Sequence, residues 1–231
     1  MKVEDGSFEQ ARRFLQLDHR TFGQLHSILE RAVGDLCDSA PEWILSPRKK
    51  TLTFEQAYKN PIRAAIALDF VFVESDYLLV DAKCLRMPEE KQRQGRARQF
   101  LRDLYAISYD INLQTVVAYA NELYGGFAWA RCGGVPKAPS LVRSELLRRA
   151  ERLEAMGAWS SEERDEAQAL VKSTNDLLLM RAASSYRNFG GRELGLEWFA
   201  ETRLGAALAW DAVWPLDNAV ARKHLEICLN G

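Results

Sequence analysis

A run of positive charge around a single glycine is the part of the sequence whose residue types best suit chemistry. Five basic residues lie within positions 91–102 around Gly95, in a chain of 231 residues with a formal net charge of -1. Pro88 ends an apolar, strand-like segment, and a helical pattern begins at Arg96. A helix start after a strand exposes unpaired N–H groups, and the helix dipole favours negative charge there. The stretch predicts an anion site, with an ordinary charged helix start as the alternative.

Two common phosphate loops are absent from this stretch. The sequence contains neither the GxxxxGK[ST] pattern of a Walker loop nor the GxGxxG pattern of a dinucleotide-binding loop. Gln92, Gly95 and Ala97 instead form the pattern Q-x-x-G-x-A between a predicted strand and a predicted helix. This pattern resembles the acyl-CoA pyrophosphate loop of the GNAT superfamily of acetyl-CoA-dependent N-acyltransferases. The resemblance implies acetyl-CoA, or another acyl-CoA, as cofactor.

The elements that would position this loop follow one another in a matching order. Residues 62–73 and 77–87 are rich in aliphatic and aromatic side chains and predict an antiparallel hairpin. Apolar residues from Ala97 to Ser108 recur at helical spacing, and residues 113–121 predict a further strand. The strand–helix–strand part would form a parallel pair. The expected fold class is α+β, a GNAT-like mixed sheet flanked by helices with a helical C-terminal extension.

The resemblance covers about residues 50 to 136 and implies specific site residues. The strand before the loop would hold the pantetheine arm through its backbone, and the loop would hold the pyrophosphate. The implied cofactor-binding residues are Leu85, Met87, Gln92, Arg93, Gln94, Gly95, Arg96, Ala97 and Asn121. A looser likeness, through a glycine-aromatic segment over 125–133, is to GNAT-like domains of phage and bacterial effector-type proteins.

The chain departs from the family where the general acid is expected. A tyrosine four residues before the glycine matching Gly133 protonates the departing thiolate in many members, and here that position is Trp129. Indole has no proton to give at neutral pH. Gly134 replaces the usual phenylalanine.

Three explanations of the missing acid stay open. The catalytic candidates are Tyr124 and Asn121, and Tyr119 and Cys132 are alternative acids. Water is a second source of the proton, because proximity and orientation supply much of such catalysis. In the third case the domain binds without catalysing.

Several carboxylates are candidates for taking the proton from an attacking amine. They lie on or next to the predicted strands: Asp69, Glu74, Asp76, Asp81 and Glu122. For each, a solvated or paired surface acid is the alternative interpretation.

The N-terminal part predicts helix and then loop. Residues 8–38 have helical periodicity, with Thr21 and Gln24 as a capping box, and "DSAPEW" and "LSPRKK" predict loops. A short helix is expected to begin at Gly125 or Gly126 and to end at Gly133.

The C-terminal part is predicted to be mostly helical. A helical hairpin is expected around Gly157, with Ser160 and Glu163 as a capping box, followed by a loop at "RNFGGREL". "LGAALAWDAVWPLD" predicts a strand pair or an edge strand, and Asp217 is the expected cap of a last helix. The domains expected are a core over 1–138 and a helical extension over 139–231 packed on it.

Composition limits the classes of function. The chain is 47% hydrophobic and near neutral, so global charge gives no reason to expect nucleic-acid or membrane binding. Its four cysteines form no CxxC pair, and His19 and His26, seven residues apart, are interpreted as ordinary helix-surface histidines rather than as a metal site. With neither a signal-peptide pattern nor a long apolar run, the expected location is cytoplasmic.

The leading hypothesis is an N-acyltransferase that passes an acyl group from acyl-CoA to an amine by direct attack. The acceptor, a small molecule or a protein, the acyl group and the oligomeric state are open. The alternative is a catalytically silent protein of the same fold that binds a protein partner, as a phage inhibitor or bacterial effector would. A nucleic-acid modifier is disfavoured by the charge.

Overall fold

The computed structural model describes residues 5–33, 37, 40–46, 48–57, 64–73, 77–85, 95–120, 125–200, 204 and 207–230. These residues form an α+β fold, as expected, with nine helices and a seven-stranded mixed sheet in the order β1-β2-β3-β4-β5-β7-β6. The chain divides into two compact units, residues 1–118 with 215–222, and residues 119–214 with 223–231. The domain boundary expected after residue 138 falls inside the second of these units.

The first unit is built on consecutive strands. β1 (Glu42–Ser46), β2 (Thr51–Ala57), β3 (Ala64–Val73) and β4 (Tyr77–Leu85) are antiparallel neighbours, whereas β5 (Leu113–Ala120) is parallel to β4. The predicted hairpin and the predicted parallel pair are therefore confirmed. The two expected loops are partly wrong, because β1 takes residues from both of them.

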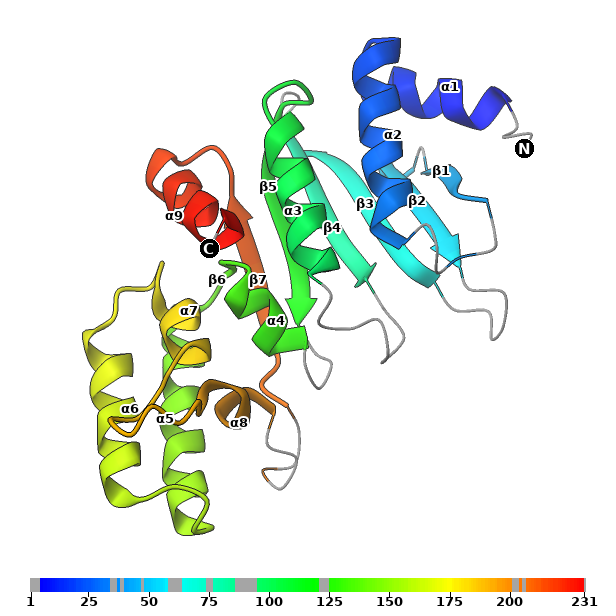
Figure 1. Ribbon diagram of the computed structural model, residues 1–231. Helices are drawn as coiled ribbons and strands as arrows, with labels where there is room; N and C mark the ends of the chain where they lie inside the picture. Colours follow the sequence, from blue (N-terminus) through cyan, green and yellow to red (C-terminus); the bar gives the residue numbers. More distant parts are fainter. Residues whose placement is uncertain are drawn as a thin grey trace. The chain divides into compact units, whose positions relative to one another are not determined.

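Three helices precede or interrupt these strands. They are α1 (Asp5–Phe14), α2 (His19–Val33) and α3 (Arg96–Ile107). Figure 1 shows α2 and α3 on the same face of the strands. Burial alternates along β2, with Leu52 and Phe54 buried and Thr53 half-buried, so one face of the sheet forms the core and the other carries polar groups.

The predicted cap of α2 is wrong. Asp18, rather than Thr21, caps the helix: its Oδ1 accepts hydrogen bonds from the backbone N–H groups of Arg20 (2.8 Å) and Thr21 (2.9 Å). Thr21 lies inside the helix and donates its hydroxyl to Asp18 Oδ2. An aspartate directly before a helix satisfies two of its unpaired donors and complements the dipole, which explains why the helix begins earlier than the threonine.

The second unit is mostly helical. It contains α4 (Gly125–Arg131), β6 (Val135–Pro136), α5 (Pro139–Ala155), α6 (Ser161–Ser173), α7 (Leu179–Ser184), α8 (Gly195–Ala200) and β7 (Trp210–Pro215). Figure 1 shows α5 and α6 side by side, and the capping box of Ser160 and Glu163 is confirmed. The edge-strand alternative for β7 is wrong, because β7 lies between β5 and β6 in the sheet order.

The last helix, α9 (Ala219–Asn230), begins in the first unit and ends in the second. Its cap is Asn218 rather than the predicted Asp217: Asn218 Oδ1 accepts from the N–H groups of Val220 and Ala221, both at 3.0 Å. Near its start the Arg222 guanidinium lies 4.4 Å from the Tyr105 ring centroid and 3.9 Å from that of Tyr109. These cation–π contacts fix α9 against the end of α3.

Candidate functional site

An extra residue near the end of β4 interrupts the sheet. Opposite β3, Leu68 pairs with Ala82 and Ala67 with Cys84, so Lys83 is a bulged residue. The ladder from β4 to β5 stops at the same place, with Ala82 and Ala118 as its last described pair. A bulge bends its strand and disrupts the ladder locally. Among the described residues Cys84 and Leu85 pair with β3, and no ladder pair joins positions 83–85 to β5.

Gly95 begins the helix that follows this strand. It is the N-cap of α3 with φ of 75°, a left-handed conformation that favours glycine, and no side chain caps the helix there. A Cβ built on Gly95 would meet nothing within 4 Å. The glycine is therefore required by the backbone conformation and not by crowding inside the protein. The first N–H groups of α3 carry the positive end of the helix dipole.

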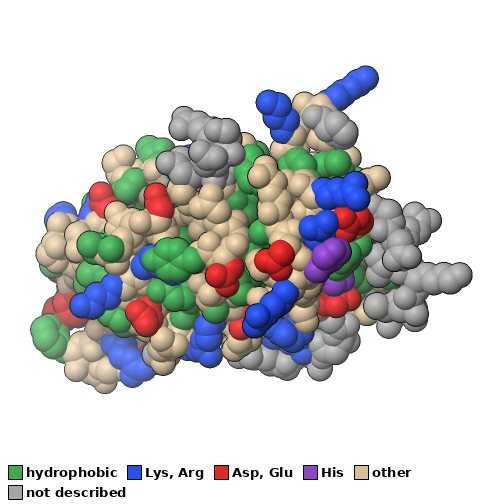
Figure 2. Space-filling view, turned by 90° about the horizontal axis from the view of Figure 1, so that it is seen from above, with side chains coloured by type: hydrophobic (Ala, Val, Ile, Leu, Met, Phe, Trp, Pro, Cys, Tyr) green, Lys and Arg blue, Asp and Glu red, His purple; other side chains and the backbone are tan. Residues whose placement is uncertain are grey.

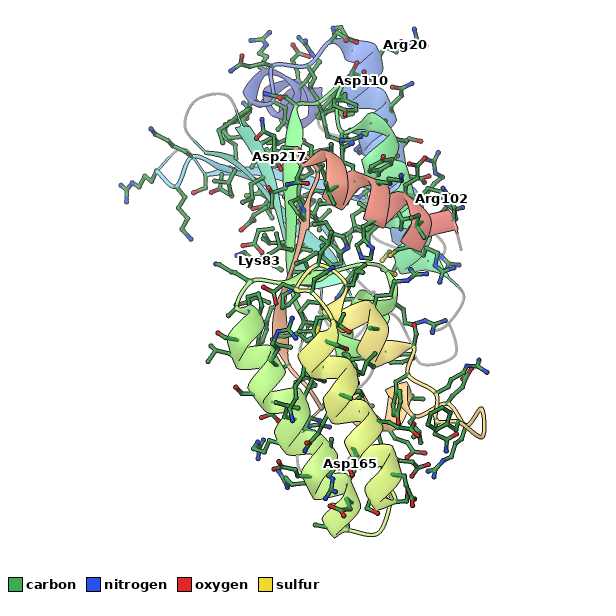
Figure 3. The ribbon with its side chains drawn as sticks, turned by 90° about the vertical axis from the view of Figure 1, so that its left-hand side faces the viewer. Arg20, Lys83, Arg102, Asp110, Asp165 and Asp217 are labelled. Atoms are coloured by element: carbon green, nitrogen blue, oxygen red, sulfur yellow. The ribbon has the colours of Figure 1, made fainter. Side chains whose placement is uncertain are left out.

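A groove of about 860 Å³ opens beside this helix start. Its walls come from α2 and from the first turns of α3: Ile28, Arg31, Ala32, Gly95, Arg96, Arg98, Gln99, Phe100, Arg102 and Asp103. Among these described residues are four guanidinium groups and one carboxylate. Its volume lies within the range usual for small-molecule sites, roughly 300–1,000 Å³. Figure 3 shows Arg102 of α3 and Lys83 of β4 on opposite sides of the strands.

The single carboxylate of this groove is already engaged. Gln99 Nε2 donates to Asp103 Oδ1 at 2.6 Å, and Arg31 lies 3.4 Å from Asp103 Oδ2. By contrast, Arg98 is half-buried and forms no hydrogen bond or ion pair with the described part of the chain. The described lining residues of the groove therefore carry a net positive formal charge, which favours an anionic ligand.

Two of the candidate proton acceptors lie together on the polar face of the sheet. Asp69 on β3 is directly opposite Asp81 on β4. Thr53 Oγ1 donates to Asp69 Oδ1 at 2.6 Å, and Lys83 forms an ion pair with Asp81. These partners offset the repulsion expected between like charges directly opposite each other. Asp81 lies two residues before the bulge.

The structure describes only part of the predicted cofactor and catalytic site. Gly95, Arg96 and Ala97 lie at the start of α3, and Leu85 is the last residue of β4. The other predicted site residues lie outside the described residues: Met87, Gln92, Arg93, Gln94, Asn121 and Tyr124. The same holds for three candidate acids, Glu74, Asp76 and Glu122.

The residue in place of the usual tyrosine belongs to the core. Trp129 is buried and its ring meets Trp214 edge to face, with centroids 5.2 Å apart. A phenylalanine at position 134 would not fit, because a Cβ on Gly134 would lie 2.9 Å from Trp210 Cη2 and 3.1 Å from Trp214 Cζ2. Tryptophan side chains thus fill the space around positions 129 and 134.

Two alternative acids differ in exposure. Tyr119 on β5 is 58% exposed, whereas Cys132 is buried. Tyr119 is therefore the more accessible of the two to a ligand at the surface.

Other titratable groups serve packing. On α9, Cys228 Sγ lies 3.5 Å from His224 Nε2, and both residues are buried. Burial, together with the nearby charge of Arg181, lowers the pKa of His224 and keeps its imidazole neutral. Among the described residues no group of three or more His, Cys, Asp or Glu side chains has the arrangement of a metal site.

A second cavity, of about 390 Å³, lies in the second unit beside α5. Arg149 forms part of its wall, and its buried guanidinium donates to the carbonyl oxygens of Trp198 (2.7 Å) and Phe199 (3.2 Å) near the end of α8. A cation at a helix C-terminus satisfies carbonyls that have no partner within the helix. This arginine therefore has a structural role.

Two features of the site were not predicted from the sequence. Arg31 reaches the groove from α2, more than sixty residues before the loop, and no local pattern indicates such a contact. The bulge at Lys83 did leave a signal, because polar and apolar residues fail to alternate cleanly along residues 77–87. A change of phase within a strand is the pattern that a bulge produces.

Comparison with known proteins gave no relatives: no protein-family model matches the chain, and neither do curated proteins or solved structures at a significant level. In the described residues no helix has the length and apolar character needed to cross a membrane.

The surface charge is mixed on the face that Figure 2 shows, where Lys and Arg side chains are interspersed with Asp and Glu.

Proposed function

We propose that the protein is an acyl-CoA-dependent N-acyltransferase of GNAT-like fold. The observation that carries this proposal is the coincidence of three features in one strand–helix connection. The described ladder to β5 ends at the bulge of Lys83, the last residues of β4 then pair with β3 alone among the described residues, and the left-handed Gly95 opens α3 beside an arginine-lined groove. The parallel pairing of β4 and β5 within an otherwise antiparallel run of strands agrees with the fold implied by the sequence resemblance.

The roles follow from the chemistry of the ligand. Pantetheine carries amide groups, and the backbone of residues 83–85, which has no described ladder partner on the β5 side, would supply the donors and acceptors that such an arm requires. The pyrophosphate would lie at the N-terminus of α3, where N–H groups and the dipole favour an anion. The acyl carbonyl would then sit near the bulge, with the acceptor amine approaching from the polar face of the sheet.

Proton transfer defines the remaining roles. The amine must lose a proton when it attacks the thioester carbonyl, and Asp81, or Asp69 opposite it, would accept that proton. The departing thiolate would be protonated by water or by Tyr124 or Tyr119, since the indole of Trp129 has no proton to give. Asn121 keeps the role proposed from the sequence, near the cofactor arm.

Calorimetry with coenzyme A and acetyl-CoA tests the cofactor claim. The wild type is expected to bind both, and Gly95→Glu is expected to weaken binding at least about tenfold, because a carboxylate at a helix N-terminus occupies and repels an anion. Gly157→Glu is the matched control. Gly157 also has a positive φ (69°) with nothing within 4 Å of an added Cβ, so both variants carry the same strain of about 1–2 kcal/mol.

Two outcomes would contradict the cofactor claim. One is no detectable binding by the wild type at high protein concentration. The other is equal weakening in Gly95→Glu and Gly157→Glu, since that would trace the effect to stability rather than to the site. Thermal unfolding of both variants separates these cases.

One observation favours the second candidate, a silent protein that binds a protein partner. Phe189 is 97% exposed at the tip of the loop between α7 and α8. That loop is held by Gly191 N–H donating to Asn188 O (2.8 Å) and by Asn188 Nδ2 donating to Glu163 (2.7 Å). An exposed aromatic ring on a pre-ordered loop has the features of an interface anchor.

Thiol release from acetyl-CoA separates the two candidates. With pools of candidate amines, turnover that Gly95→Glu abolishes and Gly157→Glu retains would exclude the silent alternative. Binding of acetyl-CoA without turnover of any amine would favour it, and Phe189→Ala would then be expected to weaken partner binding without changing the affinity for acetyl-CoA.

A further inference from the structure

The arginine groove extends well beyond what one pyrophosphate needs. Gly95 lies at one end of its α3 wall and Arg102 two turns later, about 10 Å along the helix axis. Arg98 and Gln99 lie between them on the same side, since positions three, four and seven apart share a helix face. The groove therefore has room for a second charged group of the ligand next to the one at the helix start.

The charged side chains of the groove favour a second anionic group of the ligand. Asp103 is the sole carboxylate among the described lining residues and already binds Gln99 and Arg31. Arg98 is half-buried, one turn beyond Gly95, and has no hydrogen-bond or ion-pair partner among the residues that the structure describes. A guanidinium in this position matches the planar, bidentate recognition of a phosphate group.

The remaining lining is apolar. Ile28 and Ala32 from α2 and Phe100 from α3 are buried side chains whose edges form part of the groove wall. Arginines beside an apolar wall suit a ligand that joins phosphate groups to a ribose and a flat base. In coenzyme A the ribose carries both the pyrophosphate and a 3′-phosphate. Binding of the pyrophosphate at the start of α3 would therefore bring the 3′-phosphate within about one turn along that helix.

We propose that the groove between α2 and α3 binds the 3′-phosphate of coenzyme A through Arg98, and that the protein consequently discriminates coenzyme A from dephospho-coenzyme A. This inference rests on the proposed function, because it takes the pyrophosphate to lie at Gly95. It adds a specificity-determining residue that the Q-x-x-G-x-A pattern does not contain, and it assigns a role to α2, which brings Arg31 to the same groove.

The test measures the affinity of the full chain for coenzyme A and for dephospho-coenzyme A by calorimetry. The wild type is expected to bind coenzyme A about 10- to 100-fold more tightly, the range of one charge-assisted hydrogen-bonded contact. In Arg98→Gln the two affinities are expected to differ by no more than about threefold. The substitution should weaken the binding of coenzyme A and leave the affinity for dephospho-coenzyme A unchanged. Arg20→Gln is the control, because Arg20 is exposed at the other end of α2 and its substitution removes the same charge.

Each outcome has one meaning. Equal affinity of the wild type for the two ligands would overturn the 3′-phosphate site and leave the acyl-CoA proposal standing. A ratio that persists in Arg98→Gln would overturn the assignment to Arg98. Failure of both ligands to bind would overturn the proposed function and this inference together. Thermal unfolding of Arg98→Gln confirms that a change in ratio comes from a folded protein.

Discussion

Individual residues in this chain show how burial selects a protonation state. His26 is largely buried beside Trp43, whose indole N–H donates to His26 Nδ1 at 3.1 Å. Nδ1 must therefore accept, which requires the neutral ring with its one proton on Nε2. Burial lowers the pKa of His26, and the carboxylate of Glu30, 3.6 Å from Nε2, partly opposes that shift.

This lowered pKa predicts a loss of stability in mild acid. Because His26 binds a proton less well in the folded chain than in the unfolded chain, the free energy of unfolding should fall as pH decreases below about 6.5. The slope would be at most about 1.4 kcal/mol per pH unit for one proton. Urea unfolding of the wild type between pH 7 and pH 5 measures it.

A paired variant assigns that effect. His26→Gln keeps a hydrogen-bond acceptor for Trp43 without a titrating ring, so its stability should depend less on pH, with His224 supplying the rest. His19→Gln, which removes an exposed imidazole from the same helix, is the control for the substitution itself. An identical slope in His26→Gln and the wild type would show that the interpretation of this histidine is wrong.

At the scale of elements, α6 owes its start to a reciprocal cap. Ser160 Oγ accepts from Glu163 N–H at 3.2 Å, and the Glu163 carboxylate accepts from Ser160 N–H at 2.8 Å. Glu163 also accepts from Asn188 Nδ2, which joins the cap to the loop that carries Phe189. Glu163 thus contributes both to the helix start and to the position of a neighbouring loop.

Ser160→Ala should lower the free energy of unfolding by about 1 kcal/mol, the usual effect of losing a cap. Thermal or urea unfolding provides the measurement. Ser144→Ala is the control, because Ser144 lies inside α5, is exposed and bonds only the carbonyl of Ser140 four residues earlier. That variant should be neutral or slightly stabilising. Equal effects of the two substitutions would argue against the cap.

Elements with strong local patterns were predictable, and those defined by distant partners were not. The periodicity of α3 and the apolar runs of β3, β4 and β5 indicated the correct structures. β1 was missed because five residues between turn-forming segments carry little pattern of their own, and its pairing with β2 supplies the order. β7 was identified as a strand, but its interior place depends on neighbours far away in sequence.

The residues of the candidate site likewise divide into those that local sequence signals predict and those that depend on tertiary packing. Gly95 and the helix start were identifiable, because glycine, charge and periodicity are all local signals. The cap residues were misassigned by one to three positions, since Asp18 and Asn218 compete with Thr21 and Asp217 as nearby polar residues with similar preferences. The arginine from α2 depends on tertiary packing, which one sequence does not reveal.

For the whole molecule, the path of the chain couples the two units. The chain passes between them at residues 118–119, 214–215 and 222–223, so the first unit is completed by residues 215–222 from near the C-terminus. Within that segment the Leu216 N–H donates to Gln114 O at 2.6 Å, and Arg222 lies between two tyrosines. The first unit therefore needs the chain to have passed through the second.

We expect the two units to unfold together. Five tryptophans lie in the second unit and Trp43 lies in the first, so tryptophan fluorescence reports mainly on the second unit. Urea unfolding followed by fluorescence and by far-ultraviolet circular dichroism should give the same midpoint. Two separated transitions, with the fluorescence change confined to one, would show that the units unfold independently.

The pairing of β6 with β7 has a consequence for how this chain tolerates exchange of its parts. Val135 faces Val213 and Pro136 faces Ala212, so the ends of the intervening helical segment leave the sheet from adjacent antiparallel strands, about 5 Å apart. A tight turn would join those strands equally well. The helices α5 to α8 thus leave and re-enter the sheet at adjacent positions, so a redesigned segment that keeps the contact of Phe199 with Phe127 of α4 can retain the strand register.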